Sequence, residues 1–274
     1  PTAQPPQKRR TAAMKYFYLG TSEVRWLGQA NVPLFISHRR LAPRKSFPRA
    51  LTGWALDSGG FTELSMYGQW RTTARDYNAA VWRYDQEIGN LQWASPGDWM
   101  CEPEQIARTG LSVREHQRRT IDNFQELQDL WPGPDWDVPY VPVLQGWTPD
   151  DYRRCVDMYY AAGVDLSDCF LVGVGTMCRR QASAEIDVIL STIQRHDPDI
   201  PLHAYGLKLS GLKRYGHRVL SADSMAWSWA ARMSEPLPGH THAACNNCLP
   251  YALAWRERVL DITPSGQMSL FDAA

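Results

Sequence analysis

The sequence predicts an α/β fold in which eight parallel strands and their covering helices close into a (β/α)8 barrel. The prediction rests on eight short apolar runs and on the amphipathic segments that fill most of the gaps between them. The expected strands are residues 16–20, 33–37, 54–57, 91–95, 140–145, 170–175, 202–207 and 218–223. The clearest expected helices are residues 73–88, 113–130, 150–162 and 182–195. An open doubly wound sheet is the alternative, but no G-x-G-x-x-G turn supports a dinucleotide site.

Length and composition limit the chain to one large domain, or to one domain with a small appendage. Of its 274 residues, 44% are hydrophobic and 21% are charged, as in ordinary globular proteins. Lys and Arg number 29, and Asp and Glu also number 29, so the composition does not favour a strongly basic surface that would bind nucleic acid. A local basic groove remains compatible with zero net charge, because the field near a cleft depends on how the charges are arranged.

The sequence carries no signal for export or membrane insertion. It has no run of about 18 apolar residues, and its polar beginning lacks the apolar segment of a secretory signal. Its six cysteines are irregularly spaced for a disulfide framework, and only Cys245 and Cys248 form a C-x-x-C pair. We therefore expect a cytoplasmic protein with one metal site and no membrane partner.

Four segments are expected along the chain. Residues 1–13 are rich in Pro, Gln, Lys and Arg and are expected to be disordered. Residues 14–232 are expected to form the barrel, of the TIM type, with the catalytic groups. Residues 233–262 are expected to form a metal-binding segment and a helix, and residues 263–274 a flexible tail.

Polar and glycine residues cluster where the expected strands end. In a (β/α)8 barrel the carboxyl ends of all strands meet on one face, where active sites lie. Each of these residues alone is more typical of a turn or a helix cap, but their convergence indicates an enzyme. They are Asp57, Ser58, Gly59, Gly60, Asp98, Gln145, Gly146, Gly175, Gly206, Lys208, Asp223 and Ser224.

The most specific string is W-A-L-D-S-G-G-F at residues 54–61. Its two glycines let the backbone approach a ligand closely, although a simple turn would use them too. The string resembles the D-S-G-G-F-Q motif of the tRNA-guanine transglycosylases, with Thr62 in place of the final glutamine.

The resemblance continues in the same order along the chain, in separate short segments within roughly residues 15–258. V-L-Q-G ending at Gly146 looks like the family's V-Q-G segment, whose glutamine hydrogen-bonds the base. L-V-G-V-G ending at Gly175 is similar to the strand that lines the base pocket. A-D-S around Asp223 falls where the family has its F-D-C segment with the nucleophilic aspartate. The C-x-x-C tail looks like the family's zinc cysteines running into a helix.

The resemblance implies base exchange at an N-glycosidic bond, through an oxocarbenium-like sugar. A retaining exchange needs a carboxylate nucleophile and a separate acid/base group. Asp223 is assigned as the nucleophile that attacks C1′. Asp57 is assigned as the general acid/base that takes the proton from N9 of the incoming base. Helix or turn capping is the alternative for either aspartate.

A guanine edge offers donors at N1 and N2 and an acceptor at O6, so a carboxylate suits one side and an amide or backbone N–H the other. Asp98 is the candidate for N1 and N2, with Glu102 as the alternative, because the resemblance does not fix the register there. The remaining candidates for base binding are Ser58, Gly59, Gln145, Gly146, Gly173 and Gly175. A base inside a duplex must be flipped out, or a single strand used.

The metal signal is the spacing of His240, His242, Cys245 and Cys248. Two imidazoles and two thiolates can close a tetrahedron around Zn²⁺, which would make the site structural. The family normally takes its fourth ligand from a histidine downstream, and none follows Cys248, so the upstream histidines would have to serve. A reduced C-x-x-C beside two exposed histidines is the alternative.

Several departures favour DNA over tRNA as the substrate. The chain is much shorter than a typical tRNA enzyme of the family, Ala243 replaces a cysteine, and M-A-W-S after Asp223 and Ser224 replaces an arginine-rich stretch. These features, with residues 175–180, more closely resemble the compact DNA-guanine transglycosylases of the DpdA type. That subfamily exchanges guanine in DNA for a 7-deazaguanine, often in phage genomes, so a phage-infected host cell is one expected location.

Other residues are candidates for nucleic-acid and partner contacts. Arg179, Arg180 and Lys208 follow strand ends and could bind phosphate or base, although a solvated surface is the alternative. The peptide from Gln267 to Phe271, Q-M-S-L-F, resembles the motif that docks partners onto bacterial replication clamps. A fraying apolar tail is the alternative. A sliding clamp as partner would favour a DNA substrate.

The leading hypothesis is a zinc-containing pentosyltransferase that exchanges guanine in DNA for a preQ0-like base through a covalent aspartyl-sugar intermediate. A tRNA-guanine transglycosylase and a hydrolytic base glycosylase or nucleosidase are the enzymatic alternatives. A catalytically dead barrel that only binds nucleic acid is the alternative of another class. The presence of both Asp57 and Asp223 argues against it, since a decayed site would readily lose one.

Overall fold

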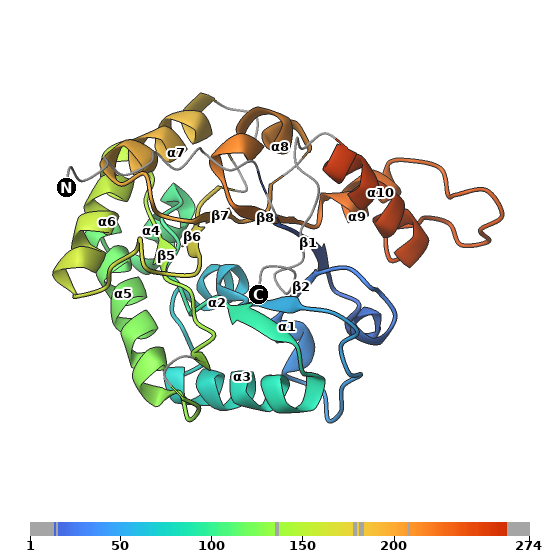
Figure 1. Ribbon diagram of the computed structural model, residues 1–274, viewed down its shortest axis with the longest axis horizontal. Coiled ribbons are helices and arrows are strands. Elements are labelled where there is room, and N and C mark those ends of the chain that lie inside the picture. Colours follow the sequence, from blue (N-terminus) through green and yellow to red (C-terminus); the bar gives the residue numbers. More distant parts are fainter. Residues whose placement is uncertain are drawn as a thin grey trace, which may run out of the picture.

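The computed structural model describes residue 14 and residues 16–134, 137–177, 180, 184–207 and 209–261. Eight parallel strands form one sheet in the order β4-β3-β2-β1-β8-β7-β6-β5, with helices packed around its outside (Figure 1). The strands are β1 (Tyr16–Thr21), β2 (Leu34–Ser37), β3 (Trp54–Asp57), β4 (Leu91–Ala94), β5 (Val143–Leu144), β6 (Val172–Val174), β7 (Leu202–Ala204) and β8 (Ser221–Ser224).

Helices fill every gap between consecutive strands. They are η1 (Val24–Gly28), α1 (His38–Leu41), α2 (Gly60–Tyr67), α3 (Ala74–Ile88), α4 (Pro103–Thr109), α5 (Val113–Leu130), α6 (Pro149–Ala161), α7 (Ala184–His196), α8 (Leu209–Tyr215) and η3 (Gly216–Arg218). Two further helices, α9 (Ala226–Arg232) and α10 (Leu249–Asp261), follow the last strand. None of the helices in the described ranges combines the length and the hydropathy that a membrane-spanning helix needs.

The sheet curls until its end strands approach each other. One isolated parallel bridge joins Ala94, the last residue of β4, to Tyr140. The N–H of Val141 donates to the carbonyl of Ala94 at 3.2 Å. The neighbouring donors cannot extend this bridge, because Pro139 has no N–H and the N–H of Val143 donates to the hydroxyl of a tyrosine on α6.

The α/β fold with eight parallel strands is therefore confirmed, whereas the expected closure is seen in the described residues only as that bridge and not as a ladder between β4 and β5. The expected strand at 140–145 is shortened to two residues for the same reason.

Strand alternation sorts the side chains into two sets, because successive residues of a strand point to opposite faces. One set packs beneath the helices, as Leu34 and Ile36 of β2 do. The other set meets inside the curl of the sheet, with one member from each of the first six strands or the residues beside them. Its members are Tyr18, Phe35, Ala55, Trp93, Val141 and Leu171.

The inward set continues at the carboxyl ends with polar residues. Asp57 is two residues beyond Ala55, and Gln145 is four residues beyond Val141, so both share the inward direction. On β7 and β8, the side chains of Leu202, Ala204 and Ala222 pack under the helices. The alternation therefore directs their neighbours His203 and Asp223 inward. The alternation thus places these polar side chains together at one end of the curled sheet.

After α9 the chain leaves the sheet as a long loop and returns as α10, at the right of Figure 1. α10 packs against α9 and β1, where the rings of Phe17 and Trp255 lie 6.1 Å apart. Trp227 of α9 donates its indole N–H to the carbonyl of Gly20 at 2.7 Å. This appendage is therefore anchored to β1, the strand that pairs with β8 and Asp223.

Candidate active site

Three carboxylates lie close together where the strands end. Asp57 is the last residue of β3, Asp223 lies in β8, and Asp98 lies in the loop after β4. Burial raises the pKa of Asp57, and the charge of Asp223 raises it further. Burial, together with the charge of Asp57, raises the pKa of Asp98 to about 7. The three groups influence one another electrostatically and so belong to one site.

The D-S-G-G string forms the turn from β3 into α2. The N–H of Gly59 donates to Oδ1 of Asp57 at 3.1 Å. Gly59 has a φ of 78°, which favours glycine, and a Cβ there would lie 2.8 Å from the side chain of Arg39. Ser37 pairs with Asp57 across the sheet, and its hydrogen bond lowers the pKa of that carboxyl less than burial raises it. A carboxyl with a raised pKa suits proton transfer.

Asp223 is held through one oxygen. Its side chain is only 8% exposed. Its Oδ1 atom accepts hydrogen bonds from the N–H of Gly206 at 2.9 Å and from Nε2 of His203 at 3.3 Å. Because both donors converge on Oδ1, the plane of the carboxylate is fixed and Oδ2 is directed away from them.

Asp98 and Gln145 are hydrogen-bonded to each other in the same site. Gln145 Nε2 donates to Oδ2 of Asp98 at 2.5 Å, and Ser58 Oγ donates to its Oδ1 at 3.5 Å. The Thr176 hydroxyl lies 2.8 Å from Oε1 of Gln145 and 3.4 Å from Oε2 of Glu102. The two sequence-based alternatives for reading a guanine edge, Asp98 and Glu102, therefore lie in one network.

α5 and α6 fix the backbone at Gln145. α6 begins with a capping box in which Thr148 and Asp151 exchange hydrogen bonds. The fully buried amide of Gln117, on α5, donates to the carbonyls of Gln145 at 2.6 Å and Asp151 at 2.7 Å. The end of β5 is thus held by both helices that pack against it.

Glycines near β5 and β6 make room for close packing. A Cβ at Gly175 would lie 2.2 Å from Nε2 of Gln145, and a Cβ at Gly173 would lie 2.6 Å from the ring of Tyr205. A Cβ at Gly146 would lie 2.8 Å from the Cβ atom of Asp151, at the start of α6. Contacts between these glycines and a base stay a prediction, but the need for small residues here follows from the distances.

Aromatic rings from three strands and from the residue after β7 surround His203. The ring centroids of Trp93 and Tyr205 lie 4.7 and 4.8 Å from that of the imidazole. Those of Tyr18 and Phe35 lie 6.1 Å away. These rings enclose the imidazole that lies beside Asp223.

Four residues of the site have no counterpart among the sequence-based expectations. They are Thr176, His203, Tyr205 and Ser221. Strand period is the signal that could have found His203, because Leu202 and Ala204 are apolar on either side of it. No sequence pattern marks Thr176, whose φ of 57° is set by its surroundings.

The candidate phosphate-binding residues are only partly described. Arg180 is buried, with its guanidinium 3.3 Å from the ring centroid of Trp147 and 3.5 Å from Glu185. Stacking on Trp147 places this charge beside the segment that follows Gln145. Arg179 and Lys208 lie outside the described residues.

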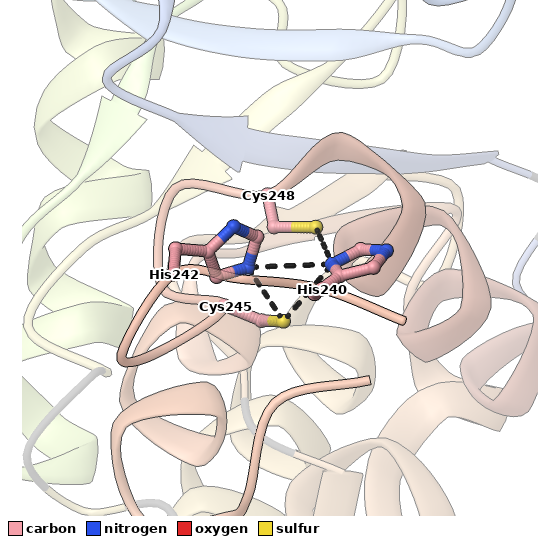
Figure 2. A group of neighbouring side chains, drawn as sticks. All are labelled: His240, His242, Cys245 and Cys248. Carbon is pink, nitrogen blue, oxygen red and sulfur yellow. Dashed lines mark hydrogen bonds between the residues drawn. The ribbon is translucent and has the colours of Figure 1, made fainter. Parts of the chain in front are cut away.

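His240, His242, Cys245 and Cys248 gather in the loop before α10, with their ligand atoms pointing toward one another (Figure 2). These atoms all lie within 4.8 Å of one another. Nδ1 of His240 lies 3.3 Å from Nε2 of His242 and 3.5 Å from Sγ of Cys248, and Nε2 of His242 lies 3.0 Å from Sγ of Cys245. A tetrahedral Zn²⁺ separates its ligand atoms by roughly 3.3–3.8 Å, so the group could hold such an ion.

Guanine binding is expected to weaken as the pH falls below about 7. The N1–H and N2–H groups of the base need an ionised acceptor, and the pKa of Asp98 is raised to about 7. Affinity should be full above that pKa and fall about tenfold per pH unit below it. Calorimetric titration of guanine across this range measures the effect. Asp98→Asn should bind weakly and lose this dependence; an unchanged wild-type affinity below pH 7 would contradict the assignment.

Loss of the metal site is expected to lower stability. Cys245→Ser should reduce bound zinc from about one ion per chain to well below it. A loss of about 3 kcal/mol would lower Tm by roughly 6–12 °C. Metal analysis and thermal unfolding, with and without a chelator, measure both effects. Cys169→Ser, at a free cysteine outside the group, is the matched control. Equal zinc content in both variants would refute the site.

The family model described as DpdA, DeoxyPurine in DNA protein A, matches residues 13–269. No curated protein matches the chain significantly. Among solved structures, the chain is similar to the YdjI aldolase from Escherichia coli K12, with 11% identity, a TM-score of 0.35 and coverage of 91% of this chain and 88% of that chain, a likeness too low to carry an argument. The family match points to modification of DNA with a 7-deazaguanine by a transglycosylase. Because this match spans nearly the whole sequence, the chain belongs to the DpdA family.

Proposed function

We propose that the protein is a DNA-guanine transglycosylase that exchanges guanine in DNA for a 7-deazaguanine base. The observation that carries the proposal is the electrostatic coupling of Asp57 and Asp223, one with a raised pKa and the other held through a single oxygen. A double-displacement exchange needs such a pair, because one carboxylate must bond to carbon while the other moves a proton.

In the first half of the reaction, Oδ2 of Asp223 attacks C1′ of the deoxyribose. The C1′–N9 bond breaks, its electron pair leaves with the guanine, and protonated Asp57 gives its proton to the departing base. Burial and the charge of Asp223 favour the protonated form of Asp57 that this step requires. The products are an aspartyl-sugar ester, free guanine and ionised Asp57.

In the second half, the incoming base occupies the same pocket. Asp57 takes the proton from its N9, N9 bonds to C1′, and the electron pair of the ester C–O bond returns to Asp223. Two inversions at C1′ retain the configuration, and Asp57 is again protonated.

The network of Asp98, Gln145 and Glu102 supports recognition of the base. Ionised Asp98 accepts from N1–H and N2–H, and the amide of Gln145 can donate to O6. Guanine and a 7-deazaguanine present the same N1, N2 and O6 edge, so one set of contacts serves the leaving and the entering base. Ser58 and Gly59 shape the turn beside this edge.

Further parts of the proposal rest on the family and on sequence. We take the curled sheet to act as a (β/α)8 barrel over residues 14–232, since the Ala94–Tyr140 bridge and the shared interior cluster support it. Residues 233–262 would form the structural zinc segment. The clamp-docking peptide, residues 267–271, lies outside the described residues, and it stays a proposal together with the cytoplasmic location and the phosphate contacts.

A labelled-base assay tests the function. The protein is incubated with labelled guanine or 7-cyano-7-deazaguanine and, separately, single-stranded DNA, duplex DNA or tRNA. Label should enter DNA. Asp223→Asn should abolish incorporation, and Asp57→Asn should slow it by about 10²- to 10⁴-fold, because a general acid/base is lost. Asp150→Asn, at an exposed aspartate on α6, is the matched control and should keep wild-type activity.

Label in tRNA alone would contradict the DNA substrate. Release of guanine from DNA without incorporation would favour a hydrolytic glycosylase. Full activity of Asp223→Asn would remove this residue as the nucleophile.

A further inference from the structure

His203 and Ser221 form a buried pair directly beneath Asp223. His203 is fully buried, and the register of β7 and β8 places it opposite Ser221. Nδ1 of His203 lies 2.8 Å from Oγ of Ser221, and Nε2 lies 3.3 Å from Oδ1 of Asp223. The imidazole therefore bridges a hydroxyl and the carboxylate of the proposed nucleophile.

The partners of the two ring nitrogens of His203 determine which nitrogen carries the hydrogen. An ionised carboxylate can only accept, so Nε2 of His203 must carry a hydrogen to bond Asp223. In the neutral ring Nδ1 is then an acceptor, and the Ser221 hydroxyl is the donor that faces it. Ser221 thus selects the tautomer whose N–H points at Asp223.

We propose that His203 is a positioning residue for Asp223, and that it acts mainly when the covalent intermediate breaks down. The inference rests on the proposed function. His203 and the N–H of Gly206 hold Oδ1 of Asp223, so Oδ2 is the atom that bonds C1′. After the ester forms, Oδ1 is a neutral carbonyl oxygen and these two hydrogen bonds are weak.

Breakdown of the ester makes the hydrogen bonds to Oδ1 strong again. As N9 of the second base attacks C1′, the electron pair of the C1′–Oδ2 bond returns to Asp223 and negative charge spreads onto Oδ1. Hydrogen bonds to a charged acceptor are roughly twice as strong as those to a neutral one. The two donors therefore stabilise the transition state of the second half of the reaction, in which Asp223 is the leaving group.

The aromatic surroundings favour this role. Trp93 and Tyr205 enclose the ring at 4.7 and 4.8 Å, which fixes its orientation and excludes water that would compete for Oδ1. A donor fixed in advance needs no reorganisation when the charge develops.

The test compares His203→Phe, His203→Gln and Ser221→Ala with the wild type. Each protein exchanges labelled guanine into end-labelled DNA, and samples stopped in detergent during turnover give the fraction of enzyme bound covalently to DNA. His203→Phe keeps a ring in the aromatic surroundings but loses the donor. We expect exchange to fall on the order of 10- to 100-fold, the effect of losing a hydrogen bond to a charged group, and the covalent fraction to rise.

The two other variants separate positioning from packing. A glutamine amide can place an N–H near the position of Nε2, so His203→Gln should recover part of the rate and lower the covalent fraction. Ser221→Ala leaves the imidazole in place but removes the hydroxyl that selects its tautomer. The exchange rate should therefore fall and the covalent fraction should rise, as in His203→Phe, but by a smaller factor. If His203→Phe does not fold in thermal unfolding, Ser221→Ala decides the question.

The outcomes distinguish this inference from the proposed function. A wild-type protein with neither exchange nor a covalent product would overturn the proposed function. A wild-type protein that exchanges, with variants that lose rate but show no rise in the covalent fraction, would overturn the inference alone. So would a His203→Gln variant no better than His203→Phe.

Discussion

Burying several carboxylates at one end of a sheet is unfavourable unless nearby donors stabilise the charge. Asp57, Asp98 and Asp223 lie close enough that the charge on one alters the pKa of another. Each of the three accepts hydrogen bonds, but the arrangement differs. Two donors converge on one oxygen of Asp223, whereas burial outweighs the hydrogen bonds at Asp57 and Asp98 and raises the pKa of both. This difference supports a separate task for each carboxylate in the proposed exchange: attack, proton transfer and base recognition.

Strand alternation brings these groups together. Apolar residues on one side of each strand pack under the helices, so the residues between them point into the curl of the sheet. The small residues near β5 and β6 then leave space for Gln145 and Tyr205. A change of register by one residue on β8 would replace Asp223 at this position with Ala222 or Ser224 and remove the site.

Much of the fold could be predicted from sequence, because apolar periodicity is local. Four of the expected strands, the first four along the chain, match the observed ones to within one residue at each end, and the expected helix at 113–130 has the observed bounds. The strands expected at 170–175 and 202–207 are observed over three residues each. The strand at 140–145 was overestimated, since Pro139 and Pro142 limit its pairing. The strand at 218–223 begins late, because Gly216–Arg218 is a 3-10 helix.

The site was less predictable. Asp57 and Asp223 could be named because each lies in a motif, but the partnership of His203 with Asp223 depends on how β7 and β8 align. Such pairing is set by the whole sheet and not by neighbouring residues. The same holds for Thr176, whose hydroxyl contacts Gln145 and Glu102 although both are distant from it in the sequence. The metal-binding group could be predicted, because its four residues lie within one short segment.

The central claim is that Asp223, and not Asp57, forms the bond to the sugar. The most direct measurement is peptide mapping of the protein after reaction with DNA is stopped during turnover and the nucleic acid is trimmed to a nucleoside remnant. We expect the mass of a deoxyribose-containing adduct on the peptide that contains Asp223. An adduct on the peptide that contains Asp57 would contradict it, as would exchange into DNA with no adduct on any carboxylate.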